Sequence, residues 1–376
     1  MVFQMADRLV VAEIDLSAYA HNIGILRSKL SKVTKFMAVV KANAYGHGIV
    51  GIAGHAEKVG VDYLGVACLG EARVLRESGI RLPILILNYI DPEGAKEAID
   101  LGVDITVMDE EVLAAVQENK APAKIHIEID TGMHRAGISP DLALQFAEKI
   151  SRIQGPRLEG IFTHFASADE TDLAFARRQL RTFQTVIDEI HQHDIHPPLI
   201  HAANSAATIV LPESHFSMVR AGVATYGLSP FASDDPNNSI FGNEFLPVLT
   251  LKTQIIQIRS IDPGETVGYG RTFKAKRKTK VALLPVGYGD GFRRAPQNWK
   301  EVLVHGRRVP ILGRVSMDQT SIDVTDIPNV KIHDEVVLLG KQGDEVLSAE
   351  EIDKNLGTIS YEVVASLAAR VSRVYN

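Results

Sequence analysis

The chain has little of several residue types that would mark specialised classes of protein. Its 376 residues include one cysteine, Cys68, and one tryptophan. A single cysteine excludes an intrachain disulfide, so the sequence carries no sign of an oxidising compartment. No stretch approaches the roughly 18 apolar residues of a membrane helix, and the N-terminus shows no basic start followed by an apolar run. We therefore expect a cytoplasmic protein without a signal peptide or membrane span.

An excess of basic residues is also lacking. The chain has 40 Lys and Arg against 46 Asp and Glu, a net charge of -6. This balance argues against nucleic acid as a partner, because phosphate binding needs a basic surface. A small substrate with a carboxylate stays compatible, since one buried arginine can bind it. The length exceeds that at which a single core stops growing, which predicts two domains.

Up to about residue 230, short apolar runs alternate with segments of helical periodicity. We predict strands at Phe36–Val40, Asp62–Val66, Ile84–Leu87, Asp104–Val107, Ile125–Ile129, Leu158–Thr163, Leu199–His201 and Met218–Val223. Helices are expected between them, at Gly70–Ser78, Pro92–Leu101, Glu110–Glu118, Pro140–Ile153 and Ala174–Gln192. Eight strands alternating with helices favour an α/β fold of the (β/α)8 TIM-like barrel type over an open sheet.

After about residue 243 the pattern changes to closely spaced strands separated by glycine and proline turns. The expected strands are Leu249–Ile258, Val281–Val286, Glu301–Val304, Ser321–Val324 and Glu335–Leu338. This spacing is typical of a mostly antiparallel β domain. We therefore expect a barrel over residues 12–243, a linker at Ser229–Gly242, and a C-terminal β domain over residues 244–376. Residues 1–11 are a candidate addition to the β domain, and the run Leu9–Ile14 is a candidate strand of it.

Polar residues recur where the predicted barrel strands end. They are Lys41, Asn43, Asn88, Tyr89, Asp130, Thr131, His164, Asn204, Ser205 and Arg220. Catalytic groups of parallel barrels lie at the carboxyl ends of the strands, so this end is the candidate site. The run KIHIEID alternates strictly, which places Lys124, His126 and Glu128 on the lumen face with Asp130. The alternative is an ion cluster at the barrel floor that only stabilises the fold.

Lys41 ends a buried strand in the run KFMAVVKANAYGHG. Burial of a lysine lowers its pKa and leaves a share of neutral amine able to attack a carbonyl. A structural lysine paired with a carboxylate is the alternative reading of this run alone.

KANAYGHG resembles the cofactor-lysine motif of the alanine racemase family. The resemblance extends over the chain in order, through AEIDLSAYAHNI, EIDTGMHRAG, THFASAD, HAANSAA, VRAGVATYGL, GYGRTF, PVGYGDGF, GRVSMDQ and YEVVASLAARV. It implies a barrel followed by a β domain, pyridoxal phosphate as cofactor, and interconversion of L- and D-alanine. A role in supplying D-alanine for cell-wall precursors is a further family expectation.

The resemblance implies that Lys41 holds the cofactor covalently. The other residues that it assigns to cofactor binding are Tyr45, His164, Asn204, Ser205, Arg220, Gly222, Val223 and Tyr361. The loops after the seventh and eighth barrel strands commonly bind phosphate, which agrees with Ser205 and Gly222. Arg220 would face the pyridine nitrogen, with His164 beside it. Since a guanidinium only donates, that nitrogen stays unprotonated, which favours racemisation over transamination.

Racemisation needs a base on each face of a planar intermediate. The resemblance assigns Lys41 to one face and Tyr269, from the β domain of the other subunit, to the opposite face, so the active unit would be a homodimer. Substrate contacts are expected from Arg135 and Met317, with Tyr288 narrowing the entrance. Asp318, beside Met317, is a supporting residue.

Two positions depart from the common family pattern inside its motifs. Glu128 stands where many members have a carbamylated lysine, and we expect its carboxylate to replace the carbamate and bond Arg135. Ser316 replaces a frequent cysteine, with no catalytic role lost.

Other functions fit parts of the sequence. A serine or broad-specificity racemase would use the same scaffold. A related decarboxylase would need a carboxylate facing the ring nitrogen, which Arg220 opposes, and a non-enzymatic pyridoxal-phosphate protein would leave the β domain unexplained. HQHDIH, with His191, His193 and His196, lacks the spacing of a zinc motif, so we expect no metal site.

Overall fold

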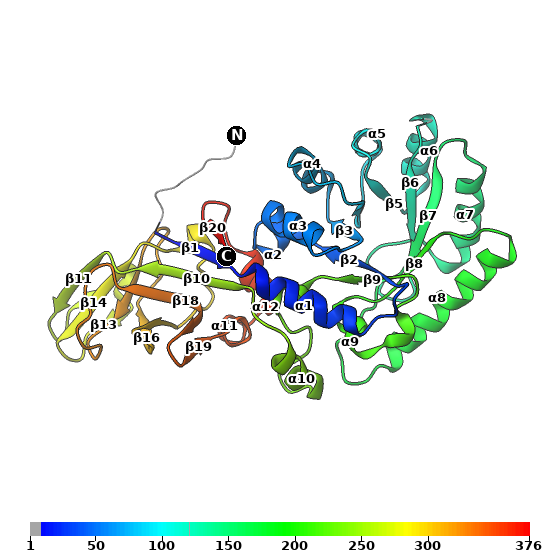
Figure 1. Cartoon of the computed structure of the whole chain (residues 1–376). Helices are drawn as coiled ribbons and strands as arrows, with labels where there is room; N and C mark the ends of the chain where they lie inside the picture. Colours follow the sequence, from blue (N-terminus) through cyan, green and yellow to red (C-terminus); the bar gives the residue numbers. More distant parts are fainter. Residues whose placement is uncertain (1–8, 120) are drawn as a thin grey trace. The chain divides into compact units, whose positions relative to one another are not determined.

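The structure is a computed structural model that describes residues 9–119 and 121–376. The backbone forms two compact units, which we describe one at a time (Figure 1). The barrel unit comprises Tyr19–Ala44 and Gly48–Leu246. The β unit comprises the described residues through Ala18 together with Tyr45–His47 and Pro247–Asn376.

The barrel unit is built on eight parallel strands. They are β2 (Lys35–Val39), β3 (Tyr63–Val66), β4 (Ile84–Ile86), β5 (Asp104–Val107), β6 (Lys124–Glu128), β7 (Arg157–Phe162), β8 (Leu199–His201) and β9 (Met218–Ala221). Neighbours follow the order β8-β7-β6-β5-β4-β3-β2-β9. Between the two end strands, Ser217 N–H donates to Ile200 O at 3.1 Å and Arg220 N–H to Ala203 O at 2.9 Å. The predicted (β/α)8 class is confirmed.

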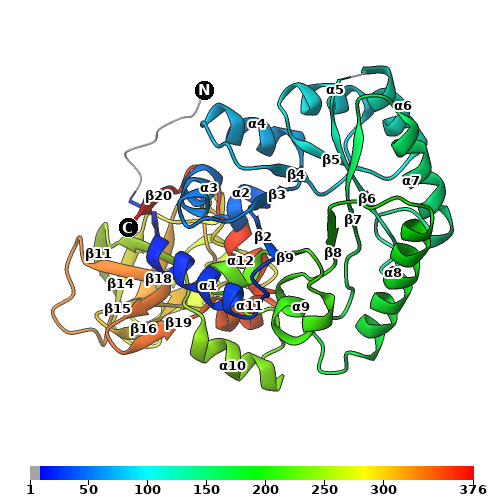
Figure 2. The same ribbon diagram turned by 45° about the vertical axis from the view of Figure 1, so that its right-hand side comes forward.

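Helices lie outside this ring of strands (Figure 2). Those of the barrel region are α1 (Leu16–Ser28), α2 (Lys41–Tyr45), α3 (Ile49–Lys58), α4 (Leu69–Glu77), α5 (Pro92–Asp100), α6 (Glu110–Asn119), α7 (Ala143–Arg152), α8 (Ala174–Gln192), α9 (Ser205–Val210) and α10 (Pro236–Glu244). Helix α8 shows why they form. Its buried residues Phe183, Val186, Ile187 and Ile190 recur at three- and four-residue spacing, which gives one apolar face.

A bulge interrupts the pairing of β6 with β7. Ile125 lies opposite Leu158, but His126 lies opposite Gly160, so Glu159 is an extra residue on β7. A Cβ atom on Gly160 would come within 2.3 Å of His126 Nδ1. Glycine is required at this position because the imidazole of His126 fills the space.

The β unit is a ten-stranded, mostly antiparallel sheet with a separate two-stranded ribbon. Its strands are β1 (Val11–Ile14), β10 (Leu249–Gln254), β11 (Gln257–Ile261), β12 (Thr266–Val267), β13 (Phe273–Lys274), β14 (Thr279–Leu284), β15 (Glu301–Val304), β16 (Arg307–Leu312), β17 (Thr320–Asp323), β18 (Glu335–Gln342), β19 (Glu345–Leu347) and β20 (Ser372–Tyr375). Helices α11 (Ala349–Leu356) and α12 (Ser360–Ala365) complete it. Strand β1 pairs with β10 and β20, so the early run Leu9–Ile14 contributes a strand here.

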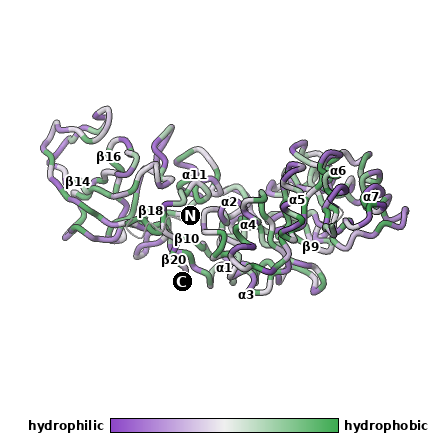
Figure 3. The backbone as a smooth tube through the Cα atoms, turned by 90° about the horizontal axis from the view of Figure 1, so that it is seen from above, coloured by the Kyte–Doolittle hydropathy of each residue, from purple (hydrophilic) through white to green (hydrophobic). Residues whose placement is uncertain are grey.

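The predicted strand Leu249–Ile258 is two strands, because the chain turns a corner at Ile255. Ile255 N–H donates to Asp334 O, which precedes β18, whereas Ile256 N–H donates to Leu283 O in β14. The chain therefore changes its sheet neighbour between β10 and β11. Along β10, buried and half-buried residues alternate, as in a sheet with one covered face, and the hydropathy of the same stretch can be followed in Figure 3.

The prediction of a linker at Ser229–Gly242 was wrong. This segment belongs to the barrel unit and contains the start of α10. Asp235 is buried, accepts a hydrogen bond from Thr171 Oγ1 and caps α10 by accepting from Asn237 N–H at 2.7 Å. Asp235 and Pro236 are thus helix-start residues, and their polarity does not mark a boundary between domains.

None of the helices in the described part of the chain is long and apolar enough to span a bilayer.

Gly160→Ala should lower the free energy of unfolding by about 1–3 kcal/mol, because the new methyl group overlaps His126. Urea denaturation followed by circular dichroism measures this change. Gly24→Ala is the control. It lies in α1 with no atom within 4 Å of the added methyl, and it should raise stability by about 0.5–1 kcal/mol. Equal stability of wild type and Gly160→Ala would contradict the close approach.

Candidate active site

Lys41 follows β2 and starts a left-handed turn. Ala42, Asn43 and Ala44 have φ of 53–54° and Tyr45 has φ of 50°. Left-handed conformation costs a residue with a Cβ about 1–2 kcal/mol. The surroundings hold the turn in place: Glu71 Oε1 accepts from Ala42 N–H at 2.6 Å, and Asn43 Oδ1 accepts from Ile49 N–H at 2.9 Å. Backbone strain of this kind is typical of a segment that must present a reactive group in a fixed direction.

The Lys41 amine lies in a charged and partly desolvated environment. Burial lowers its pKa, and Arg135 lowers it further. Glu71 and Glu128 oppose this shift, while Arg220 adds to it. A larger share of neutral amine follows, which agrees with the predicted nucleophile or base.

Arg220 lies at the end of β9 inside the barrel and is 4% exposed. Its two terminal nitrogens donate to three backbone carbonyls, at Thr163, Ala202 and His201, over 2.8–3.2 Å. They also donate to His201 Nδ1 at 3.1 Å and to His164 Nδ1 at 3.2 Å. Burial lowers the pKa of Arg220 to about 10, so the guanidinium remains protonated at neutral pH. Of the Arg220 donors, only Nε–H has no hydrogen-bond partner among the described residues.

His164 stands beside Arg220 as predicted. Burial lowers its pKa well below the usual range, and the charges of Arg220, Arg135 and Lys41 act in the same direction. A neutral imidazole results, whose Nδ1 accepts from Arg220 and whose Nε2 carries the proton. His164 can therefore donate a hydrogen bond from that nitrogen.

The predicted phosphate-binding residues come together after β8 and β9. Ser205 Oγ accepts from Gly222 N–H at 2.9 Å and from Ala224 N–H at 3.3 Å, and Val223 lies between these two amides. Asn204 caps α9 by accepting from Ala207 N–H at 3.0 Å. A hydroxyl beside several backbone N–H groups is a donor set that suits a phosphate.

Glu128 is buried at the end of β6, in the field of three cations. Burial raises the pKa of its carboxyl group, and the negative charge of Asp130 raises it further. The positive charges of Arg220, Arg135 and Lys41 act in the opposite direction. Within residues 9–119 and 121–376, no direct ion pair joins Glu128 to Arg135, which is exposed in the loop after β6. The expected bond between them is not made here, and the two groups interact at longer range.

The remaining predicted residues belong to the β unit. Tyr269, Met317 and Tyr288 are 66%, 54% and 43% exposed. The guanidinium carbon of Arg294 lies 5.7 Å from the centroid of the Tyr269 ring, a cation–π distance. Three residues expected to meet the substrate therefore lie on the surface of their own unit.

Arg370 joins the loops that carry Tyr288 and Met317. It pairs with Asp290 at 2.8 Å and with Asp318 at 2.9 Å, and it donates to Met317 O at 3.3 Å. The loops also touch directly, because Tyr288 N–H donates to Ser316 O and Gly289 N–H to Met317 O. A Cβ on Gly287 would lie 2.2 Å from Ser316 O, and one on Gly289 would lie 2.4 Å from the Arg370 guanidinium. The glycines of PVGYGDG permit this packing.

The segment that contains Tyr45 lies against the helix that contains Tyr361. Gly46, next to Tyr45, approaches the backbone of Val364 in α12 so closely that a Cβ would lie 2.0 Å from Val364 O. Arg373 Nε donates to Gly46 O at 3.0 Å. The Tyr45–His47 segment therefore packs on the helix that carries Tyr361.

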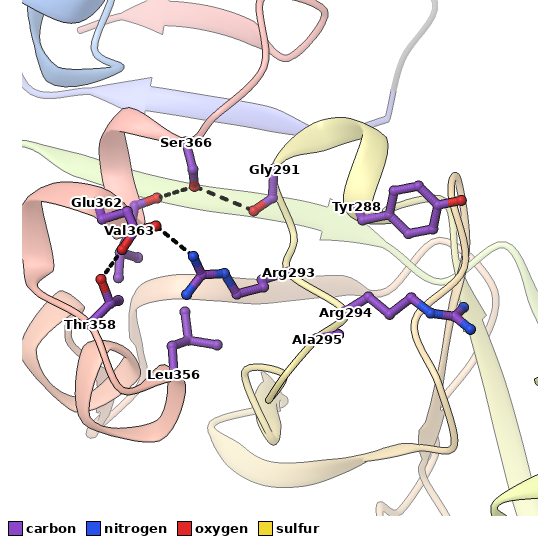
Figure 4. A pocket seen from close by; sticks show the side chains of 10 residues that line it. All are labelled: Tyr288, Gly291, Arg293, Arg294, Ala295, Leu356, Thr358, Glu362, Val363 and Ser366. Carbon is purple, nitrogen blue, oxygen red and sulfur yellow. Dashed lines mark hydrogen bonds and ion pairs between the residues drawn. The ribbon is translucent and has the colours of Figure 1, made fainter.

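A pocket of about 410 Å³ in the β unit is lined by Tyr288 and nine further residues (Figure 4). On one side Arg293 pairs with Glu362 at 2.5 Å, while Tyr288 and Arg294 extend away from that pair. Only Tyr288 among its lining residues belongs to the predicted site, so this pocket is distinct from the barrel groups around Lys41. No group of three or more potential metal ligands occurs in the part of the chain that the structure describes.

Sequence reasoning missed several residues of this site. Glu71, Arg294 and Arg370 carry no motif signal of their own, because their partners come from distant segments. The glycine spacing of PVGYGDG was a signal for the close loop packing, and the alternation of KIHIEID was one for the buried His126.

Comparisons with known proteins agree with this architecture. Residues 14–230 match the family model of the alanine racemase N-terminal domain, and residues 248–375 that of the C-terminal domain. The chain is 41% identical to an alanine racemase of Desulfovibrio desulfuricans, covering 98% of each chain. It is 39% identical to one of Methanococcus maripaludis, covering 99% of this chain and 100% of the relative.

Solved structures give the same result. An alanine racemase structure from Clostridium difficile 630 has a TM-score of 0.92 at 35% identity, covering 98% of this chain and 96% of the other. One from Bacillus anthracis with bound L-Ala-P has a TM-score of 0.91 at 35% identity, covering 98% and 95%. Matches to both domain models, with full-length relatives near 40% identity, show that the chain belongs to the alanine racemase family.

Proposed function

We propose that the chain is a pyridoxal-phosphate-dependent alanine racemase that acts as a homodimer in the cytoplasm. The observation that carries this proposal is the barrel constellation of Lys41, Arg220 and Ser205 at the ends of β2, β9 and β8. An amine, a fixed cation and a cluster of backbone N–H groups would suit the three polar parts of the cofactor: its aldehyde, its ring nitrogen and its phosphate.

The residues present fit this cofactor by their chemistry. Lys41 would hold the aldehyde through its amine, and Ser205, Gly222, Val223, Tyr45 and Tyr361 would hold the phosphate. Both terminal nitrogens of Arg220 donate to protein acceptors, so Nε–H is the donor that would face the ring nitrogen. A donor at that place supports an unprotonated ring. When bound, the cofactor supplies an electron sink that acidifies the α-hydrogen of the amino acid.

The chain's own residues then hold and move the α-proton. Lys41 exchanges it on one face of the substrate, and the phenol of Tyr269 exchanges it on the other. Arg135 and the backbone N–H of Met317 bind the substrate carboxylate. His164 accepts a hydrogen bond from Arg220 at Nδ1 and can donate one from Nε2. The tyrosines Tyr45, Tyr269 and Tyr288 leave room for a methyl side chain.

The exposure of Tyr269, Tyr288 and Met317 supports the dimer. A base acting in a water-excluded site needs cover, and these side chains have little within their own unit. A second copy supplying this face to the first copy's barrel gives the two-base geometry.

Reduction of the purified enzyme with sodium borohydride should attach the cofactor permanently to Lys41, and peptide mass spectrometry locates the adduct. The same preparation should interconvert L- and D-alanine in a chiral assay. Lys41→Ala should lose both the adduct and the activity, because no amine remains at that place. Lys35→Arg, at the start of the same strand, should retain both. An enzyme without any reducible adduct would overturn the proposal.

Tyr269→Phe should lower racemisation by about 10²–10⁴-fold, because one of two proton-transferring groups is lost. The loss of kcat/KM is equal in both directions, since the enantiomers have equal free energies. Exchange of the α-hydrogen with solvent deuterium, followed by NMR, should persist for one enantiomer only, through Lys41. Tyr288→Phe should leave exchange in both enantiomers. Persistence of both in Tyr269→Phe would argue against opposed bases.

Glu128→Gln should lower activity by about tenfold, because the buried anion facing Arg220, Arg135 and Lys41 is lost. The intact mass of the wild-type chain should show no carbamate. Glu128→Lys is the matched variant: bicarbonate should restore its activity by carbamylating the new amine. Full activity of Glu128→Gln would show that no negative charge is needed at this position.

A further inference from the structure

A line of buried polar groups runs from Arg220 across the barrel lumen to β5. Arg220 Nη1 lies 3.1 Å from His201 Nδ1, and His201 Nε2 lies 3.1 Å from His126 Nδ1. His126 Nε2 lies 3.4 Å from Asp104 Oδ2, which also accepts from Tyr63 OH at 3.2 Å. Both imidazoles are 0% exposed. We call the four residues Arg220, His201, His126 and Asp104 the lumen chain.

The lumen chain can carry its hydrogens in only one direction. Arg220 has no acceptor, so His201 Nδ1 must accept and His201 Nε2 must hold the proton. His126 Nδ1 then accepts from His201, and His126 Nε2–H donates to the carboxylate of Asp104. With the opposite tautomers, two N–H groups would face each other at Arg220. The donor at Arg220 and the acceptor at Asp104 therefore favour the same tautomers of both rings, from the two ends of the lumen chain.

Burying the lumen chain inside the barrel has a cost in packing. A barrel lumen is normally filled by branched apolar side chains, and buried polar groups are costly unless fully bonded. Here β7 carries a bulge and a glycine at residue 160, which make room for the ring of His126. Phe162 stacks on His201 with ring centroids 4.9 Å apart and planes 10° apart. Burial lowers the pKa of His201 well below its usual range, and the charge of Arg220 adds to that effect, so the ring stays neutral.

We propose that His126 and Asp104 are positioning residues, which hold His201 as an acceptor and so keep the Arg220 guanidinium turned with Nε–H toward the cofactor ring nitrogen. This inference rests on the proposed function. It assigns a role to residues two and three hydrogen bonds away from Arg220, on strands β6 and β5. The polar face of KIHIEID thus serves the reaction as well as the stability of the barrel.

Loss of the lumen chain should change where a proton is delivered. If the guanidinium turns and the ring nitrogen becomes protonated, a proton can add to the cofactor carbon in place of the α-carbon. Hydrolysis with one water then releases pyruvate and leaves the amino group on the cofactor. This transamination consumes one alanine and one cofactor, so pyruvate counts the misdirected turnovers.

Two substitutions at His126 separate positioning from packing. In His126→Gln, the amide oxygen can accept from His201 and the amide nitrogen can donate to Asp104, so the direction of the lumen chain is kept. His126→Leu fills similar space without either group. Asp104→Leu removes the acceptor at the end of the lumen chain and fills a similar space. His215→Gln is the control, because His215 is buried in the same unit, and among the described residues its imidazole bonds only the carbonyl of Thr208, at 3.1 Å.

Histidine-selective ¹⁵N NMR of the cofactor-loaded enzyme tests the tautomers directly. We expect wild-type His201 to show a protonated Nε2 and an unprotonated Nδ1. His126→Gln should keep this pattern, whereas His126→Leu and Asp104→Leu should alter it. A wild-type His201 protonated at Nδ1, or a His201 spectrum insensitive to both disruptive variants, would overturn the proposal. This readout does not depend on racemase activity.

The ratio of pyruvate formed to alanine racemised tests the consequence. We expect this ratio to rise about tenfold in His126→Leu and Asp104→Leu, which corresponds to about 1.4 kcal/mol, and to stay within about twofold of wild type in His126→Gln and His215→Gln. A fall in kcat with an unchanged ratio in the disruptive variants would mean a merely structural role and would refute positioning. A wild-type enzyme that does not racemise alanine would instead refute the proposed function, and the NMR result would still stand by itself.

Discussion

A guanidinium buried in the lumen of the barrel is the constraint on which the proposed chemistry depends. Within the described chain, carbonyl oxygens and imidazole nitrogens bond Arg220, with no directly bonded carboxylate. A bonded carboxylate would neutralise the charge and take up the donors that orient it. With neutral acceptors, the cation keeps its charge and its direction, and Glu128 offsets the charge from a distance.

The residues proposed to act together come from two separately packed units. Lys41, Arg220 and Ser205 belong to the barrel unit, whereas Tyr45 packs with the β unit although it is only four residues from Lys41. Lys41, which bears the reactive amine, thus stands at the start of the left-handed turn. The chain passes from the barrel unit to the β unit at the end of this turn. Its unfavourable backbone conformation is held by side chains such as Glu71, which bonds Ala42 N–H. The turn fixes the backbone that follows Lys41 at the end of β2.

Period and composition predicted the barrel well, because parallel strands buried on both faces read as short apolar runs. The strands Asp104–Val107 and Leu199–His201 and the helix Ala174–Gln192 have the predicted bounds. The failures have physical causes. The apolar run at Leu249–Ile258 continues through a corner where only the hydrogen-bond partner changes, and the polar run near Asp235 is a helix cap. Local sequence reports neither event.

The candidate site was predictable to the extent that its residues lie at strand ends or in family motifs. Alternation along KIHIEID placed His126 and Glu128 in the lumen, and the structure has His126 bonded there. The expected bond from Glu128 to Arg135 is not made, because the loop carrying Arg135 leaves that side chain exposed. Arg370 could not be found from sequence, since its partners Asp290 and Asp318 lie far away along the chain. Contacts of this kind require the fold itself.

The position of β20 has a consequence for biosynthesis. Strand β1, near the beginning of the chain, is flanked by β10 and β20, and Arg370, just before β20, ties the loops of Tyr288 and Met317. Residues 370–375 leave the ribosome after the barrel residues. The barrel strands pair mostly with their neighbours in sequence. The barrel can therefore assemble during translation, whereas β1 waits for partners made hundreds of residues later. A truncated product would present a folded barrel with an unpaired strand edge, a species prone to aggregation.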